Sequence, residues 1–406
     1  MNLDPFAHSG QPPSSASAGR GLGISLRWCS PEANHIDSRA LACPERDEVL
    51  SDLLTRLDAQ GSEPLTRRFQ AGELVPDWDA GKLIGISGHR FPRTHGPRQF
   101  EPRQGRFYPG AFFAGVPGLP QSPPTAGRVA SIAPEATITV DFNHPLAGRP
   151  LELDLRLLDF VPPGEATGNL GRAAVTNGPG MQARWRGQPT DFGSRGPYAR
   201  GDSRPDAEFY AVPRMVQHLD DTALARIRAL YGAIVPGNGR VLDLMSSWTS
   251  HLDSGRHSGE VAGLGMNADE LAANPLLSER VVQDLNRDPR LPWPEACFDA
   301  VVCTVSVEYL TRPVAVFQEV RRVLRPRGRF VLTFSNRWFP SKAIALWPEL
   351  HEFERMGLVL DFLLAAGGFE NLETWSLRGL PRPATDQYAA RLVFSDPVYA
   401  VWGEAA

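Results

Sequence analysis

Side chains that can bind a polar ligand follow short apolar runs in the second half of the chain. Each run has the length of a buried strand, and the residues after it carry carboxylate, hydroxyl, amide or aromatic groups. The candidate cofactor-binding residues are Asp243, Ser246, Ser247, Trp248, Asn267, Asp284 and Leu285, and the candidate catalytic residues are Glu308 and Tyr309. In an open α/β sheet, ligands bind at the carboxyl ends of the strands, so these groups are expected to meet at one edge.

The elements that must position these groups alternate between strand and helix from about residue 205 to residue 406. Strands are expected at 240–245, 260–266, 280–285, 298–306 and 328–335, with short closing strands at 389–394 and 398–403. Helices are expected at 207–235 (broken at Pro213), 268–274, 313–324, 341–347 and 353–366. This alternation implies crossover connections and a mostly parallel sheet covered on both faces. We expect residues 205–406 to fold independently.

The motifs of this region resemble those of class I (type 11-like) S-adenosylmethionine-dependent methyltransferases. The most specific stretches are LPWPEACFDAVV and EVRRVLRPRGRFVLTF. In that family an acidic residue before the first stretch contacts the adenine, and Asp284 matches it. The resemblance implies a Rossmann-like fold, S-adenosylmethionine as cofactor, and an enzyme that methylates an unknown small-molecule or protein substrate.

The loop after the first strand departs from the family pattern. In the family, an Asp is followed by a Gly-x-Gly-x-Gly loop; here Asp243 is present, but the glycine positions hold Met245, Ser247 and Thr249. Side chains at these positions disfavour left-handed backbone. The acidic residue that holds the ribose in the family is replaced by Gly265. A non-catalytic, methyltransferase-like binding module is therefore an open alternative.

We expect this loop to take a different path from that of the glycine loop. In that path the hydroxyls of Ser246 and Ser247 and the ring of Trp248 would take over part of the contacts to the donor's tail and adenosine. Methyl transfer is an in-line displacement, so the protein must mainly align donor and acceptor and, where needed, accept a proton.

The first half of the chain predicts a different kind of structure. Residues 1–45 are rich in Gly, Ser and Pro and are expected to be largely disordered. Residues 46–162 are expected to form a small β-rich domain, in which 137–142 and 151–157 alternate apolar and polar residues like a half-buried antiparallel pair. Residues 163–204, rich in Gly, Arg and Pro, are expected to be a linker.

The two strands and the turn between them resemble the closing strands of SlyD-like FKBP peptidyl-prolyl isomerases. The turn has the Asn-His-x-Leu-Ala-Gly pattern of that family, from Asn143 to Gly148. The resemblance does not extend upstream, where a Gly- and Pro-rich stretch at 75–135 replaces the family's pocket-lining segment. Prolyl isomerase or chaperone activity is thus a further alternative, although a partner-binding or structural role fits this domain better.

Bulk composition limits the remaining possibilities. The 406 residues carry a formal net charge of −4, so a nucleic-acid partner is not expected. The four cysteines form no CxxC pair and are expected to be free thiols in a reducing compartment. No signal peptide, membrane span or metal-binding motif is recognisable, so a cytoplasmic location is expected.

Overall fold

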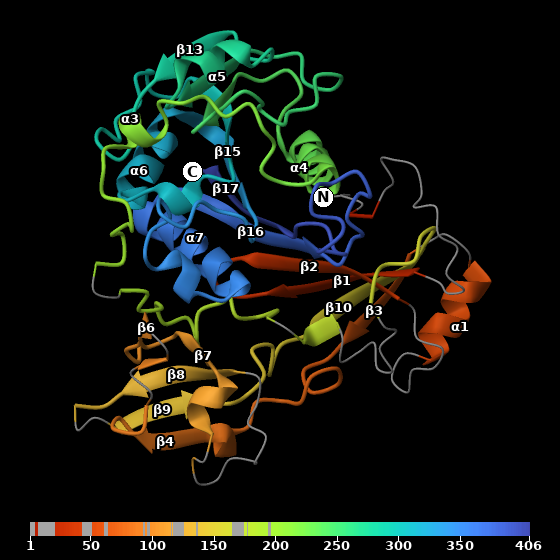
Figure 1. Ribbon diagram of the computed structural model, residues 1–406. Helices are drawn as coiled ribbons and strands as arrows, with labels where there is room; N and C mark the ends of the chain where they lie inside the picture. The colour runs from red at the N-terminus through yellow and green to blue at the C-terminus, as the bar shows by residue number, and fades with distance from the viewer. Residues whose placement is uncertain are drawn as a thin grey trace.

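The fold is built around one long mixed sheet (Figure 1). The computed structural model describes residues 5–6, 21–42, 51–60, 64–91, 94–95, 98–114, 116, 126–134, 137–164, 174–176, 178–193 and 196–406. Within these residues, eleven strands form the long sheet in the order β13, β12, β11, β14, β15, β17, β16, β2, β1, β10, β3. A second sheet has four strands in the order β4, β9, β8, β7.

The strands of the long sheet come from both halves of the chain. The second half provides β11 (Val241–Leu244), β12 (Val261–Gly265), β13 (Glu279–Val282), β14 (Phe298–Thr304), β15 (Leu324–Phe334), β16 (Phe369–Arg378) and β17 (Val398–Ala405). The first half provides β1 (Gly21–Cys29), β2 (Asn34–Ala42), β3 (Leu65–Phe69) and β10 (Leu151–Leu158).

The remaining elements form the small sheets and the helical layers. The four-stranded sheet contains β4 (Leu83–Ser87), β7 (Phe107–Pro109), β8 (Ala126–Ile132) and β9 (Thr137–Asp141), and β5 (Thr94–His95) pairs with β6 (Arg98–Gln99). The α-helices of the described residues are α1 (Ser51–Gln60), α3 (Asp206–Phe209), α4 (Asp221–Ile234), α5 (Ala268–Ala273), α6 (Pro313–Val323) and α7 (Glu352–Ala366).

The second half of the chain has the expected Rossmann-like α/β arrangement. The strands β13, β12, β11, β14 and β15 run parallel, whereas β17 is antiparallel to both of its neighbours, β15 and β16. Helix α4 packs on one face with Val302 and Val331, while α6 and α7 pack on the other with Val301 and Leu332. Strand β14 is apolar because both of its faces are covered. This half of the sheet is therefore mostly parallel, as expected, whereas the eleven-stranded sheet as a whole is mixed.

The prediction of one helix over 207–235 is wrong, because the helix is interrupted in its middle. Residues 210–219 form a loop between α3 and α4. Helix α4 begins only after this loop, because the Asp220 carboxylate caps it by accepting a hydrogen bond from the backbone N–H of Ala223 at 3.1 Å. The loop is therefore free to follow its own path over the ends of the strands.

Two further expectations near the end of the chain are also wrong. Residues 389–394 form a turn and an irregular segment instead of a strand, and residues 341–346 form turns and bends that lead into the short 3₁₀ helix Trp347–Glu349 instead of an α-helix. On the side away from β15, β17 pairs with β16, a strand that sequence periodicity does not reveal. Its pattern is broken because the register shifts between Glu370 and Glu373, where a bulge interrupts the alternation.

The expectation that residues 1–45 are disordered is wrong for 21–42, which form β1 and β2. Leu22, Ile24, Leu26 and Trp28 alternate along β1 and are all buried. The residues between 1 and 45 that lie outside 5–6 and 21–42 are not among those described. Strand order places β1 and β2 inside the long sheet, so this segment is ordered by pairing on both sides.

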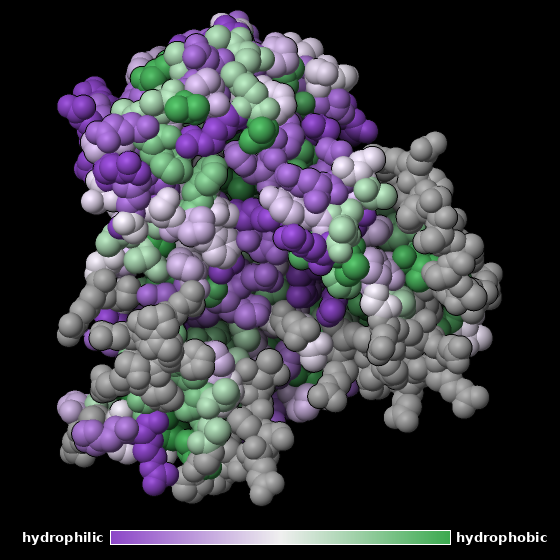
Figure 2. All heavy atoms as spheres, viewed as in Figure 1, coloured by the Kyte–Doolittle hydropathy of each residue, from purple (hydrophilic) through white to green (hydrophobic). Residues whose placement is uncertain are grey.

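Strand β2 joins the two halves of the chain by pairing in parallel with β16. Polar side chains fix this junction: the Ser376 hydroxyl donates to Asp37 at 2.6 Å, and His35 Nδ1 lies 2.8 Å from the Thr374 hydroxyl. Asp37 also forms an ion pair with Arg378 at 2.7 Å. On the face seen in Figure 2, mainly hydrophilic residues cover the middle of the molecule. The two halves thus share one sheet.

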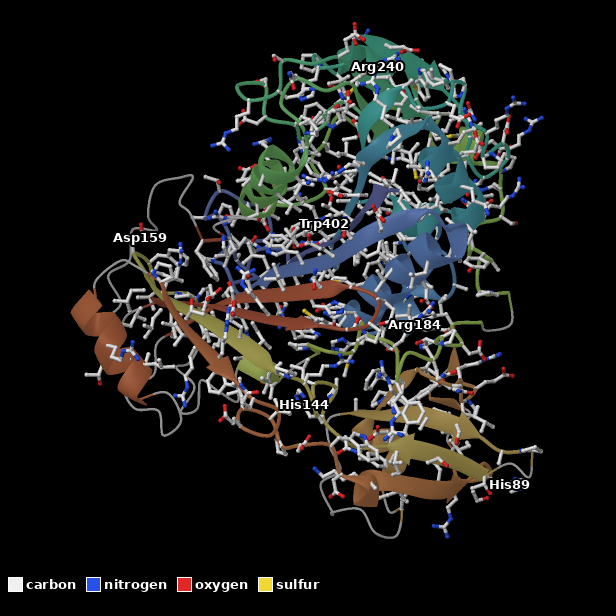
Figure 3. The ribbon with its side chains drawn as sticks, turned by 180° about the vertical axis from the view of Figure 1, so that it is seen from behind. His89, His144, Asp159, Arg184, Arg240 and Trp402 are labelled. Carbon is white, nitrogen blue, oxygen red and sulfur yellow. The ribbon has the colours of Figure 1, made fainter. Side chains whose placement is uncertain are left out.

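The expected antiparallel pairing of 137–142 with 151–157 is wrong. Strand β9 pairs with β4 and β8 in the four-stranded sheet, whereas β10 pairs with β1 and β3 in the long sheet. The alternating faces are real, but Val140 packs in one core and Leu153 in another. His144 lies at the corner where the chain passes between the sheets (Figure 3). Residues 46–162 accordingly contribute strands to the long sheet, to the four-stranded sheet and to the β5–β6 pair.

The segment expected to be a linker is packed against the rest of the protein where it is described. Arg184 forms an ion pair with Asp361 of α7 at 2.7 Å, and Arg128 of β8 donates to the backbone carbonyl of Ala183. No helix of the described residues has the length and apolar character that a membrane crossing requires.

Candidate functional site

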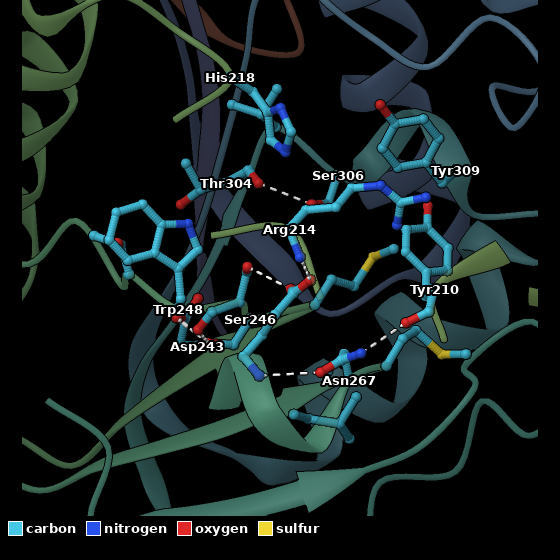
Figure 4. Close-up of a pocket in the computed structure, with 18 of the residues that line it drawn as sticks. Tyr210, Arg214, His218, Asp243, Ser246, Trp248, Asn267, Thr304, Ser306 and Tyr309 are labelled. Atoms are coloured by element: carbon cyan, nitrogen blue, oxygen red, sulfur yellow. Dashed lines mark hydrogen bonds between the residues drawn. The ribbon is translucent and has the colours of Figure 1, made fainter. Parts of the chain in front are cut away.

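A cavity opens at the carboxyl ends of β11, β12 and β14 (Figure 4). The space at its mouth and interior, open solvent included, is ≈ 1190 Å³. Its walls come from the 210–219 loop, the loop after β11, the ends of β12 and β13, the turn after β14, and Phe339. All seven candidate cofactor-binding residues line it, and so does Tyr309.

The loop after β11 is held against the neighbouring strand. The Ser246 hydroxyl donates to Asp243 Oδ2 at 2.5 Å, and the Ser246 backbone N–H donates to the Leu264 carbonyl at 2.7 Å. Met245 has φ 59°, so it adopts the left-handed backbone that glycine would adopt at no cost. The expectation that this loop avoids left-handed backbone is therefore wrong at Met245.

Gly265 has a structural role that accounts for the missing acidic residue. A Cβ atom at this position would lie 2.2 Å from the Ser246 carbonyl oxygen, far inside van der Waals contact. The loop after β11 occupies the space that any side chain at 265 needs. This path of the loop is thus compatible with glycine at 265 but not with a larger residue.

The polar groups expected to contact the donor are also used to hold the protein itself. The Ser247 hydroxyl donates to Glu270 Oε2 at 2.6 Å, and Trp248 Nε1 donates to the Val216 carbonyl at 3.2 Å. A hydroxyl that donates once still has lone pairs with which it can accept a hydrogen bond. Ser247 can therefore accept from a ligand, while Trp248 offers only its ring.

Both the oxygen and the nitrogen of the Asn267 side-chain amide form hydrogen bonds within the protein. Its oxygen caps α5 by accepting from the backbone N–H groups of Asp269 and Glu270 at 3.0 and 3.1 Å. Its nitrogen donates to the carbonyls of Tyr210 and Ala211 at 2.9 and 3.1 Å. Asn267 thereby fastens the 210–219 loop over the cavity.

Asp284 keeps one carboxylate oxygen available. Its Oδ1 accepts from the backbone N–H of Asn286 at 2.9 Å, while its Oδ2 has no protein partner among the described residues. Leu285 beside it is buried and lines the cavity. A free carboxylate oxygen next to an apolar side chain suits a flat ring that carries an amino group.

The two candidate catalytic residues differ in position. Glu308 is fully buried, is not among the residues that line the cavity, and neither of its carboxylate oxygens has a hydrogen-bond partner among the described residues. Burial raises the pKa of Glu308 to about 8, so it is mostly protonated at neutral pH. Tyr309 lines the cavity, and its hydroxyl accepts from the Phe339 N–H at 2.8 Å. Of the two, only Tyr309 is placed to contact a ligand.

The 210–219 loop contributes cavity residues that sequence reasoning missed. They include Tyr210, Arg214 and His218, and Glu270 of α5 joins them. Burial lowers the pKa of His218 below its usual value, so its imidazole is neutral at pH 7. The sequence feature that could have indicated these residues is a cluster of aromatic, basic and imidazole side chains around Pro213. A proline at this position makes a continuous helix unfavourable.

Asp243 should make stability depend on pH. Burial raises the pKa of Asp243 to about 6, against the opposing hydrogen bonds from Ser246 and Ser250. The folded state therefore holds the Asp243 proton more tightly than the unfolded chain does. This proton stabilises the fold in full below about pH 4, and the stabilisation is lost as the pH rises through about 6. We expect the unfolding free energy of the wild type relative to Asp243→Asn to fall by about 2–3 kcal/mol from pH 4 to pH 7.

Urea unfolding of both chains at several pH values measures this change. Asp253→Asn, which alters a half-exposed carboxylate in the same loop region, is the matched control. A constant difference between wild type and Asp243→Asn across this range would contradict the raised pKa.

The doubly wound half of the sheet and its cavity define a class of protein that binds ligands at the carboxyl ends of parallel strands. Residues 237–332 match the family model described as "Methyltransferase domain". The second half of the chain therefore contains a methyltransferase domain.

Curated relatives match part of the same region. The chain is similar to the ubiquinone/menaquinone biosynthesis C-methyltransferase UbiE of Chromobacterium violaceum, with 34% identity over 103 residues, which is 24% of this chain and 41% of the relative. It is also similar to UbiE of Paraburkholderia phymatum, with 41% identity over 54 residues, or 13% of this chain and 22% of the relative. The chain thus spans less than half the length of either relative.

Solved structures similar to this chain include two S-adenosylmethionine-dependent methyltransferases. The protein from Archaeoglobus fulgidus has 17% identity and a TM-score of 0.31, and the match covers 45% of this chain and 92% of that one. The protein from Aquifex aeolicus has 13% identity and a TM-score of 0.32, and the match covers 50% of this chain and 97% of that one.

Proposed function

We propose that this protein transfers a methyl group from S-adenosylmethionine to an acceptor bound beneath the 210–219 loop. The observation that carries the proposal is the cavity at the carboxyl ends of β11, β12 and β14, three strands of the region that matches the methyltransferase model. The bound donor would supply an electrophilic methyl group, and the protein's task would be alignment.

The residues that line the cavity fit the donor's parts. The free Oδ2 of Asp284 can accept a hydrogen bond from an adenine amino group beside Leu285. Glu270, one turn into α5, can replace the missing acid at Gly265 as the carboxylate for the ribose, since each carboxylate oxygen can accept more than one hydrogen bond. The loop after β11 would lie against the amino-acid tail.

His218 is the best-placed group for taking a proton from the acceptor. It lines the cavity, its ring packs edge-on against Phe339 with centroids 5.2 Å apart, and no ring nitrogen has a partner among the described residues. A neutral imidazole with a free nitrogen is a competent general base. Tyr309, whose hydroxyl pKa is raised well above its usual value by burial, would act as a hydrogen-bond donor instead.

Calorimetric titration with S-adenosylhomocysteine tests the proposal. We expect the wild type to bind it, and Asp284→Ala to weaken binding by about 1–3 kcal/mol, because the adenine amine would lose its acceptor in a closed site. Asp288→Ala, an exposed carboxylate in the same turn, is the matched control and should bind like the wild type. Absence of binding by the wild type, or equal affinity of the Asp284 variant with its fold intact, would refute the assignment.

A non-catalytic binding module remains the second candidate, because the loop hydroxyls of Ser246 and Ser247 already donate to protein carboxylates. Donor binding without turnover on any acceptor would favour it. Prolyl isomerase activity of the first half, a cytoplasmic location and the lack of a nucleic-acid partner stay predictions from sequence.

A further inference from the structure

Arg214 brings a positive charge into an otherwise acidic and apolar cavity. Among the described residues that line the cavity it is the single Lys or Arg. Its guanidinium carbon lies 4.6 Å from the ring centroid of Phe209, 5.8 Å from that of Tyr210 and 5.7 Å from that of Phe339. These rings hold the guanidinium in place, and Figure 4 shows Arg214 among the residues that line the cavity.

The hydrogen-bonding capacity of Arg214 is only partly used. Its Nη2 donates to the Phe209 carbonyl at 2.9 Å, whereas Nη1 is buried and has no partner among the described groups. An unsatisfied buried donor is costly unless a ligand completes it.

The neighbouring carboxylates do not neutralise Arg214. Glu270 accepts from the backbone N–H of Arg214 and from Ser247, and the structure shows no ion pair between the two side chains. Asp206 is paired with Arg200 at 2.7 Å and with Lys342 at 3.1 Å. The Arg214 guanidinium is thus a fixed cation that lacks a protein counterion in the described structure.

We propose that Arg214 binds an anionic group, most simply a carboxylate, of a flat-ringed methyl acceptor. A planar guanidinium matches a carboxylate in geometry and charge. Tyr309 and Phe339, whose ring centroids are 5.9 Å apart, both line the cavity and provide an apolar wall beside the guanidinium. His218 packs on the same Phe339 ring, which places the general base of the proposed function beside this subsite. The inference rests on that function and adds the class of acceptor.

The amino-acid carboxylate of the donor could also pair with a guanidinium. The position of Arg214 in the cavity must therefore decide whether it binds the donor's carboxylate or one on the acceptor. Arg214 packs on Phe339, beyond the end of β15, and Asp284 marks the adenine side. The tail of the donor would lie at the loop after β11 instead. We therefore assign the Arg214 subsite to the acceptor.

The test compares ring carboxylates with their neutral amides. Benzoate and 4-hydroxybenzoate, with benzamide and 4-hydroxybenzamide as isosteres, are titrated into the full chain with and without excess S-adenosylhomocysteine. The wild type should prefer each carboxylate by about 10-fold or more, Arg214→Gln should abolish that preference, and Arg214→Lys should keep part of it. Arg287→Gln removes an exposed arginine outside the cavity lining and should change nothing.

Two outcomes would overturn the proposal. The first is a wild type without a carboxylate preference, or a preference that survives in Arg214→Gln. The second concerns two donor analogues, of which 5′-methylthioadenosine lacks the carboxylate. In this outcome Arg214→Gln binds S-adenosylhomocysteine more weakly than the wild type does, but binds 5′-methylthioadenosine as tightly as the wild type does. That pattern would assign Arg214 to the donor's tail. If the wild type does not bind S-adenosylhomocysteine, the proposed function fails, and the titrations without it still decide whether Arg214 forms an anion subsite.

Discussion

A chain that begins at residue 205 is expected to aggregate or to lose its cooperative unfolding transition. Without β2, β16 keeps β17 on one side but loses its partner on the other side from Glu373 to Arg378, and becomes an exposed edge strand, a template for aggregation. The same truncation removes Phe6 and Phe160, which pack in one cluster with α4 and Trp375. The structure thus leads to the opposite of the independent folding expected from sequence. Sedimentation and thermal unfolding of the purified fragment measure the effect.

A nicked full-length chain is the matched control. A protease site placed after the exposed Arg204 would give the same second fragment while leaving the first in place. We expect the two fragments to remain bound to each other and to unfold in one transition. A soluble, monomeric 205–406 fragment that unfolds as sharply as the intact chain would show that β16 does not need β2.

Restoring the family's acidic residue by Gly265→Asp is expected to damage the protein rather than improve it. The new Cβ would meet the Ser246 carbonyl oxygen at 2.2 Å, and Leu271 Cδ2 lies 3.1 Å away on the other side. The loop cannot easily withdraw, since Asn274 also holds the Ser247 carbonyl at 2.9 Å. We expect a loss of about 2–4 kcal/mol in unfolding free energy, typical of a severe overpacking change, together with loss of donor binding.

Gly265→Ala separates the steric effect from the effect of charge. Gly265→Ala places the same Cβ without a carboxylate, so it should lower the unfolding free energy nearly as much as Gly265→Asp does. Met266→Asp adds the charge at a half-buried neighbouring position and should lower it less. Urea unfolding of all three variants gives the comparison. A stable Gly265→Asp chain with tighter S-adenosylhomocysteine binding would mean that the loop leaves room for the family's carboxylate.

The candidate site was largely predictable because its residues follow strands whose pattern is local. Asp243 and Asp284 each follow a run of apolar residues, and parallel strands bring such ends together. The loop conformation was not predictable, because the left-handed backbone of Met245 depends on contacts such as that between Ser246 and Leu264. Arg214 and His218 were missed because the composition of residues 210–219 is that of a helix. These residues were expected to continue one helix over 207–235, but they form a loop between α3 and α4.

The first half of the chain was harder to predict for a different reason. Its strands have clear alternation, yet alternation does not say which strand is the neighbour. Thus 137–142 and 151–157 looked like partners although they belong to different sheets. Residues 21–42 carry an apolar face, but the Gly-, Ser- and Pro-rich surroundings masked it, and their partner β16 lies more than 300 residues away.

The pairing of β2 with β16 also sets an order of events during synthesis. His35 and Thr374, which meet in this pairing, are 339 residues apart in sequence. At a translation rate of about 5–20 residues per second, the free edge of β2 waits roughly 20–70 s for its partner. Contacts between such distant residues carry a large loop-closure cost and slow folding. The N-terminal strands of a nascent chain therefore depend on protection of that edge, by a chaperone or by transient local structure, until the last strands emerge from the ribosome.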